Sequence, residues 1–263
     1  MVLANGKERD VTGRLEGKVA LITGTGGGQG RAAAEMFCAE GAKVIGCDRN
    51  AAENERTVDI VRGSGGDMVG MAPVDLGDSR EARRWVADAV AVHGRLDVLF
   101  NNAAAPRFAP LAELTDEEWH STIRNELDLV FYVTQAAWPH LVAGGGAIVN
   151  TASVQGLVGI AVNGGLAHAA AKAGVIAMTR QMAAEGAPHG IRANSISPGT
   201  IATPATGDTF ADGDLLAAVL APLLVKRLGR PADVVPLAVF LASEESAYVT
   251  GADFVVDGGL TAT

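Results

Sequence analysis

Residues 18–30 read Lys-Val-Ala-Leu-Ile-Thr-Gly-Thr-Gly-Gly-Gly-Gln-Gly, an apolar run that leads directly into a glycine-rich turn. A helix-favouring stretch, which begins Arg31-Ala32-Ala33-Ala34, follows this turn. Glycines let the backbone approach a phosphate without a Cβ clash, and the start of a helix favours negative charge. The strand before the turn and the helix after it therefore predict a nucleotide site rather than a flexible turn.

Short apolar runs alternate with helical patterns along the rest of the chain. The candidate strands are 18–23, 43–47, 68–74, 96–101, 146–152, 191–197 and 252–256. The candidate helices are 29–40, 52–63, 78–93, 115–143, 164–187 and 231–242. This alternation predicts an α/β fold in which about seven strands form one Rossmann-like, doubly wound parallel sheet with helices on both faces.

The composition is even along the 263 residues and favours one domain. Residues 1–14 are polar and are expected to form a flexible N-terminal tail, which leaves 15–263 as the single nucleotide-binding catalytic domain. Hydrophobic residues make up 48% of the chain but aromatic residues only 5%, so the core has to be built from Ala, Val, Leu and Ile. Such a core suits strands that are buried on both faces.

The charge and the apolar runs exclude several classes of protein. A net charge of −9 argues against a nucleic-acid partner, which requires a basic face. No run approaches the length of a membrane span and no secretory signal is visible, so we expect a cytoplasmic protein with no membrane association. The two cysteines, Cys38 and Cys47, are expected to be reduced and buried, and no zinc-type ligand spacing predicts a metal.

Acidic residues end the second and third candidate strands. Asp48 can accept hydrogen bonds from ribose hydroxyls and repels a 2′-phosphate, which favours NAD over NADP. The adjacent Arg49 could receive a phosphate, but no basic residue lies within 25–28 to complete an NADP clamp. Asp75 and Leu76 could contact the adenine, or Asp75 could cap the following helix.

The least regular segment, residues 199–230, follows a strand end and contains a short apolar helix predicted over Leu215 to Leu224. A segment of this kind is a candidate lid, the alternative being a solvent-exposed loop. Its small apolar side chains suggest an apolar or cyclic substrate.

The chain resembles the short-chain dehydrogenase/reductase family over residues 15–260. The motifs that carry the resemblance are Thr23-Gly24-x-x-x-Gly28-x-Gly30, Asn101-Asn102-Ala103, Ile148-Val149-Asn150-Thr151-Ala152-Ser153, Pro198-Gly199-x-x-x-Thr203 and Val256-Asp257-Gly258-Gly259. The resemblance implies a nicotinamide cofactor, hydride transfer to or from an alcohol or carbonyl carbon, and a homotetramer built on two long central helices. The cofactor contacts that we expect are Thr23, Gly24, Gly28, Gln29, Gly30, Asp48, Arg49, Asp75, Leu76, Asn102, Ala103, Ala104, Lys172, Pro198, Gly199, Ile201 and Thr203.

The family's catalytic set is Asn, Ser, Tyr and Lys, and this chain departs from it at two positions. Ser153 and Lys172 match the set. His168 occupies the Tyr position, four residues before the lysine, and Glu126 occupies the Asn position, seven residues after Trp119. The neighbouring Asn125 is expected to point to a different side of the helix.

The altered set is chemically coherent. Imidazole titrates near pH 6.5 without assistance, so His168 can act as either acid or base. Lys172 shares a helix face with it, and Glu126 could anchor Lys172 or a proton-relay water, while Ser153 could donate to the substrate oxygen. We therefore expect an NAD-dependent oxidoreductase that acts on a secondary alcohol or ketone. The alternatives are a catalytically silent NAD-binding protein and a C=C reductase or epimerase on the same scaffold.

Overall fold

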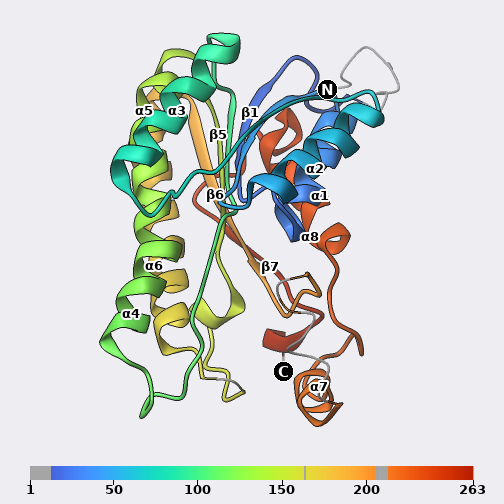
Figure 1. Cartoon of the computed structure of the whole chain (residues 1–263), viewed down its shortest axis with the longest axis vertical. Helices are drawn as coiled ribbons and strands as arrows, with labels where there is room; N and C mark the ends of the chain where they lie inside the picture. Colours follow the sequence, from blue (N-terminus) through green and yellow to red (C-terminus); the bar gives the residue numbers. More distant parts are fainter. Residues whose placement is uncertain (1–12, 163, 205, 207–212, 263) are drawn as a thin grey trace, which may run out of the picture.

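Seven parallel strands form one sheet in the order β3-β2-β1-β4-β5-β6-β7 (Figure 1). The computed structural model describes residues 13–162, 164–204, 206 and 213–262. The strands are β1 (Val19–Thr23), β2 (Lys43–Cys47), β3 (Asp67–Met71), β4 (Val98–Asn101), β5 (Gly146–Thr151), β6 (Ile191–Pro198) and β7 (Asp253–Val256). The chain reverses direction across the sheet between β1 and β4, which confirms the predicted doubly wound fold.

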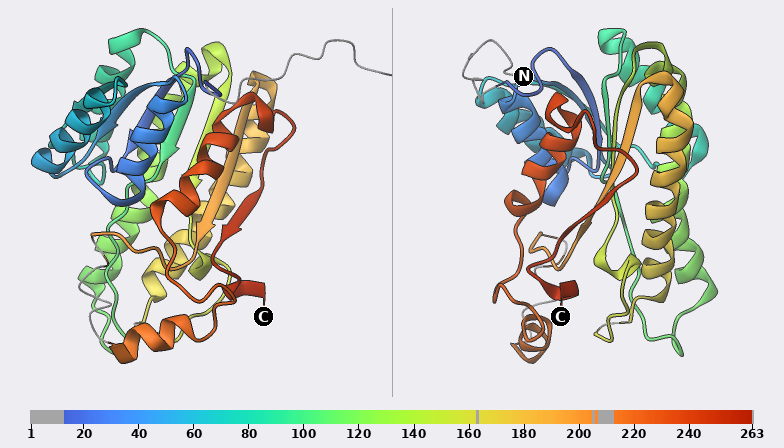
Figure 2. Two further views of the ribbon diagram at one scale, coloured as in Figure 1. Left: turned by 90° about the vertical axis from the view of Figure 1, so that its right-hand side faces the viewer. Right: turned by 180° about the vertical axis from the view of Figure 1, so that it is seen from behind.

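Helices cover both faces of the sheet (Figure 2). One face packs against α1 (Gly28–Ala39), α2 (Ala51–Gly63) and α8 (Pro231–Ala242), and the other against α3 (Ser79–His93), α5 (Leu129–Gly144) and α6 (Leu166–Gly186). The remaining α-helices of the described residues are α4 (Asp116–Ile123) and α7 (Gly213–Leu220). None of the helices in the described ranges is long and apolar enough to cross a membrane.

The apolar runs form strands because both of their faces are covered. Every residue of β1 is at most 2% exposed. Phe37 of α1 and Val239 of α8 belong to the core on one face, while Trp85 of α3 and Val175 of α6 belong to the core on the other. Burial on both sides replaces the alternating pattern of a half-exposed strand with a continuous apolar run.

A chain of buried amide and hydroxyl groups joins the centre of the sheet to the helices. Asn101 at the end of β4 donates to Thr134 Oγ1 at 3.0 Å and to Asn150 Oδ1 at 2.8 Å. Asn150 in turn donates to Thr179 Oγ1 of α6 at 2.9 Å. These hydrogen bonds fix the strand ends relative to α5 and α6, although the buried Asn101 Oδ1 has no partner of its own.

The prediction of a single helix over 115–143 is wrong in its middle. The segment forms α4, then the π-helical turn η1 (Arg124–Asp128), then α5. A π-helical turn accommodates one extra residue and changes the direction in which neighbouring side chains point, and such turns occur often at functional sites. Three-and-four periodicity does not reveal it, because apolar residues continue on both sides of the turn.

Other boundaries differ from the prediction for local reasons. The third strand ends at Met71 instead of residue 74, since Pro73 has no N–H to donate to the ladder. The helix of the candidate lid covers Gly213–Leu220 instead of reaching Leu224, and its last α-type bond is Ala221 N to Ala217 O, just before Pro222. Residues 205 and 207–212 of the expected lid lie outside the described residues.

The N-terminal tail was predicted to extend to residue 14, and residues 1–12 of it lie outside the described residues. Arg14, however, is anchored to the end of α1. Its backbone N–H and its Nε donate to the Glu40 carboxylate at 3.1 and 3.0 Å. The hydrogen bond from Arg14 lowers the pKa of Glu40.

Candidate active site

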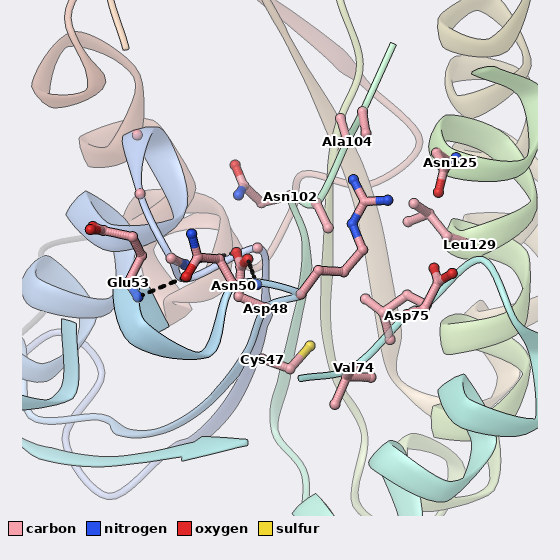
Figure 3. Close-up of a pocket in the computed structure, with 18 of the residues that line it drawn as sticks. Cys47, Asp48, Asn50, Glu53, Val74, Asp75, Asn102, Ala104, Asn125 and Leu129 are labelled. Carbon is pink, nitrogen blue, oxygen red and sulfur yellow. Dashed lines mark hydrogen bonds between the residues drawn. The ribbon is translucent and has the colours of Figure 1, made fainter. Parts of the chain in front are cut away.

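A cleft with a volume of about 430 Å³ opens at the carboxyl ends of β1, β2 and β4. Its lining includes the expected residues Gly24, Gly28, Gln29, Asp48, Arg49, Asp75, Leu76, Asn102, Ala103, Ala104 and Thr203. This is the side of a doubly wound sheet at which ligands bind. Figure 3 shows Asp48 and Asn50 on one side of the cleft and Asp75, Asn125 and Leu129 on the opposite side.

The glycine-rich turn fits a nucleotide diphosphate through its backbone. Gly28 has φ +52°, which an L side chain rarely adopts. A Cβ on Gly30 would lie 1.9 Å from Gly24 O, so only glycine permits this close turn. A Cβ on Gly27, the residue before α1, would meet nothing within 4 Å. The N-terminus of α1 therefore borders open space where a phosphate can approach its N–H groups.

Asp48 holds the turn as well as lining the cleft. Its Oδ2 accepts from Gly26 N and its Oδ1 from Asn50 N, both at 2.8 Å. Beside it, Glu53 forms a 2.6 Å ion pair with Arg31, which also donates to Gly26 O at 2.6 Å. The end of the cleft at β2 thus carries two carboxylates, and Arg31 is already paired with one of them.

The ends of β1 and β4 support each other beneath the cleft. Thr23 is buried and does not line the cleft itself. Its Oγ1 accepts from the backbone N–H groups of Asn102 and Ala103, both at 2.9 Å, and Asn102 Nδ2 donates to Thr23 O at 3.1 Å. Thr23 therefore shapes the floor of the cleft.

The Asp75 carboxylate accepts one hydrogen bond from the backbone and one from a side chain. Its Oδ1 accepts from Gly77 N at 3.0 Å, and its Oδ2 accepts from Arg124 of η1 at 2.7 Å. The helix cap that we considered as its alternative role belongs to Asp78, which accepts from the N–H groups of Arg80 and Glu81. Asp75 instead connects the segment after β3 to η1 on the same side of the cleft.

Six expected cofactor residues lie outside the lining, namely Thr23, Gly30, Lys172 and, at and after the end of β6, the three residues Pro198, Gly199 and Ile201. Pro198 ends β6 and is buried, and Gly199 packs against the backbone of Asp257. Ile201 is 7% exposed and pairs with Gly229. Of this segment Thr203 and Pro204 reach the cleft, so the three residues before them act by directing the chain that carries Thr203.

Glu126, His168 and Lys172 come together in a buried cluster, which we call the Glu126 cluster. His168 Nδ1 lies 2.6 Å from Glu126 Oε2, and Lys172 Nζ lies 3.6 Å from Glu126 Oε1. The exposed fractions of the three side chains are 0% for Glu126, 3% for Lys172 and 12% for His168. Lys172 Nζ also donates to Thr151 O at 3.0 Å.

The ring of His168 is covered by an aromatic side chain. Phe108, in the segment after β4, has its ring centroid 5.3 Å from that of His168, with the planes tilted by 54°. Phe108 itself is 49% exposed. Among the described residues, no group of three or more His, Cys, Asp or Glu side chains could hold a metal ion.

Ser153 lies at the end of β5 but is engaged locally. Its Oγ accepts from Gln155 N at 3.2 Å and caps the short 3₁₀ turn Val154–Gly156. Within the described ranges, no hydrogen bond joins Ser153 to His168 or Lys172. The structure thus brings three of the four expected catalytic side chains into contact and leaves Ser153 beside them.

The turn η1 divides two neighbouring side chains between the two parts of the site. Asn125 lines the nucleotide cleft and donates to Ser121 O at 2.8 Å, whereas Glu126 points to His168. The expectation that these two residues face different sides agrees with this geometry. Sequence reasoning did not assign Asn125 and Leu129 to the cleft, because that assignment depends on the π-helical turn.

Asn50 and Glu53 were also missed as lining residues, although a signal existed for both. Asn50 caps α2 by accepting from Glu53 N at 3.1 Å. An asparagine that can cap a helix, placed just after the acidic residue at the end of a strand, marks the start of a helix beside the cleft. Cys47 lies next to them in the lining, and burial raises the pKa of its thiol, so it remains protonated.

The chain matches known proteins over almost its full length. Residues 24–261 match a family model described as enoyl-(acyl carrier protein) reductase. A 3-oxoacyl-[acyl-carrier-protein] reductase of Thermotoga maritima is 40% identical, covering 94% of this chain and 99% of that protein. A D-threitol dehydrogenase of Mycolicibacterium smegmatis is 38% identical, covering 94% of each.

Solved structures show the same similarity. A short-chain dehydrogenase/reductase from Burkholderia xenovorans has a TM-score of 0.91 and 39% identity, covering 96% of this chain and 99% of that one. A 2-deoxy-D-gluconate 3-dehydrogenase from Agrobacterium tumefaciens, solved with bound NADP, has a TM-score of 0.86 and 35% identity, covering 95% and 98%.

Proposed function

This chain belongs to the short-chain dehydrogenase/reductase family, and on that premise we propose that it is an NAD-dependent oxidoreductase in which His168 is the acid/base. The reaction is hydride transfer between the nicotinamide and the carbon of a secondary alcohol or ketone. The observation that carries the proposal is the buried contact of His168 with Glu126, beside Lys172. Two departures from the family's catalytic set thus meet each other, as a retuned site requires.

The cleft residues would hold the cofactor, and the Glu126 cluster would accept and return the proton. When bound, NAD supplies the hydride acceptor for oxidation or, as NADH, the donor for reduction. His168 takes the hydroxyl proton during oxidation and returns it during reduction. Ser153 donates to the substrate oxygen, and Lys172, whose ammonium stays beside Thr151 O, orients the nicotinamide ribose.

We propose NAD over NADP because of the charges at the end of β2. A 2′-phosphate on the adenine ribose would meet Asp48 and Glu53, and Arg31 is already paired with Glu53. Arg49 lines the same region and is the residue through which NADP could bind instead. The related structure from Agrobacterium tumefaciens was solved with bound NADP, so the preference of this chain for NAD or NADP has to be measured.

We propose an apolar alcohol or ketone as the substrate. Phe108 contacts His168 and is half exposed, and other large apolar side chains on nearby segments are similarly exposed: Leu157, Val158 and Leu166. A polyol such as that named for the Mycolicibacterium smegmatis relative would leave hydroxyls facing apolar side chains.

The assembly that we propose is the expected homotetramer. Phe131 is 46% exposed on α5, and an exposed aromatic side chain on this helix supports a contact between subunits. We also propose that the protein is cytoplasmic.

A substrate screen tests the proposal. The purified protein is incubated with NAD⁺ or NADP⁺ and a panel of cyclic, long-chain and polyhydroxylated alcohols, and reduced cofactor is read by its absorbance. We expect turnover of apolar secondary alcohols with NAD⁺. Tight NADH binding with no turnover of any alcohol or ketone would instead support a silent NAD-binding protein, and a saturated or epimerised product would support the other two reactions.

A further inference from the structure

We propose that Glu126 is a positioning residue that holds the proton of His168 on Nδ1, so that Nε2 is the atom that exchanges a proton with substrate. This inference rests on the proposed function, because it names the reacting atom of that same site. It concerns the state of His168 in the protein itself, however, and can be tested without a substrate.

The contact itself fixes the direction of the hydrogen bond. Glu126 Oε2 and His168 Nδ1 are 2.6 Å apart, and the Glu126 side chain is fully buried. An ionised carboxylate can only accept hydrogen bonds, so Nδ1 must be the donor. A neutral imidazole has one N–H, and placing it on Nδ1 leaves the lone pair on Nε2.

Lys172 supplies the positive charge that favours the ionised form of Glu126. The ammonium Nζ lies 3.6 Å from Glu126 Oε1, which has no hydrogen-bond partner of its own. A buried charge requires a nearby opposite charge, and these two side chains supply one to each other. The expected pairing of Glu126 with Lys172 is present as an ion pair, while the hydrogen bond of the lysine goes to Thr151 O and that of Glu126 goes to His168.

The surroundings of the ring oppose a flip that would exchange its two nitrogens. Phe108 packs against the imidazole with 5.3 Å between the ring centroids. A flipped ring would lose the bond to a buried carboxylate, which costs more than the loss of an ordinary hydrogen bond. Glu126 and Phe108 together therefore hold the His168 ring in one orientation.

The same arrangement supports proton uptake. The charged groups in contact with the ring are Glu126 from η1 and, through it, Lys172 from α6. When Nε2 gains a proton, the imidazolium is bonded to the carboxylate, which offsets the repulsion from the lysine. Glu126 thus assists His168 in the step in which the alcohol loses its proton to Nε2.

Nitrogen NMR of ¹⁵N-histidine-labelled protein tests this directly. The chain has five histidines, and a His168→Gln variant assigns the signals of His168. In the wild-type protein at high pH, we expect a protonated Nδ1 and an unprotonated Nε2. In Glu126→Gln, we expect the two tautomers to mix.

Glu117→Gln is the matched control, since Glu117 lies on α4 and is exposed, and it should leave the His168 signals unchanged. A proton on Nε2 in the wild-type protein would overturn the inference, as would an unchanged Nδ1–H tautomer in Glu126→Gln. If that variant does not fold, the wild-type tautomer alone decides. A protonated Nδ1 without turnover of any substrate would refute the proposed function only, and turnover by a protein with Nε2–H would refute this inference only.

Discussion

The cleft and the Glu126 cluster are built in different ways. The cleft is built largely from backbone: a glycine turn leads into the start of α1, where Gly30 permits no Cβ, and a carboxylate follows the next strand. In the cluster, two side chains 42 residues apart are joined at 2.6 Å through a π-helical turn. A local motif specifies the first, whereas tertiary packing alone creates the second.

Removing the acid/base should separate the two regions most strongly. We expect His168→Ala to lower kcat by roughly 10²–10⁴-fold, the usual contribution of a general acid or base, while NADH affinity stays close to that of the wild-type protein. Stopped-flow turnover and NADH fluorescence titration measure the two quantities. His120→Ala, at an exposed position on α4, is the control. Unchanged turnover would remove His168 from the mechanism.

Changing the cleft instead should alter the choice of cofactor. For Asp48→Ala we expect the preference for NAD⁺ over NADP⁺ to fall by roughly 10–100-fold, because hydrogen bonds to a charged group contribute about 1.5–3 kcal/mol. The ratio of kcat/KM for the two cofactors is the measurement, since damage to the shared glycine turn cancels in it. Asp59→Ala, exposed on α2, should leave the ratio unchanged. A ratio that does not move would mean that Asp48 does not select the cofactor.

A smaller effect is expected at the far end of α1, where Arg14 lowers the pKa of Glu40. Because the pKa of Glu40 is lowered in the folded protein, the pair with Arg14 stabilises the fold above the ordinary titration range of glutamate. This stability is lost as the pH falls through the lowered pKa. We expect Glu40→Gln to cost about 0.5–1 kcal/mol at pH 7 and almost nothing near pH 3. Denaturant unfolding at both pH values measures this. Equal losses at both would show that the ion pair contributes nothing.

The sheet was predictable because a local run of apolar residues specifies each strand. Apolar runs such as Val19–Thr23 are bounded by glycine or by a charged residue, and their burial on both faces makes them continuous. Elements whose ends depend on hydrogen bonding were predicted less well. The ladder of β3 ends before Pro73, and α7 ends before Pro222, as the missing proline N–H would have indicated.

The site was predictable in its parts but not in its connections. The glycine turn and Asp48 lie in the cleft to which their motif pointed. Glu126 forms the expected ion pair with Lys172 at 3.6 Å, but the sequence did not specify its 2.6 Å hydrogen bond with His168. No pattern of three or four residues reveals the π-helical turn η1 that aims Glu126 at α6 and Asn125 at the cleft. Side-chain direction at such a turn is a property of the packed helices.

The central claim is that Glu126 and His168 act as one unit, and a double-mutant cycle tests it most directly. The kcat of Glu126→Gln, of His168→Ala and of the variant that carries both is measured with one substrate from the screen. Residues that act through each other lose their effects together, so the account predicts that the double variant is as slow as His168→Ala alone. Losses that multiply in the double variant would contradict it.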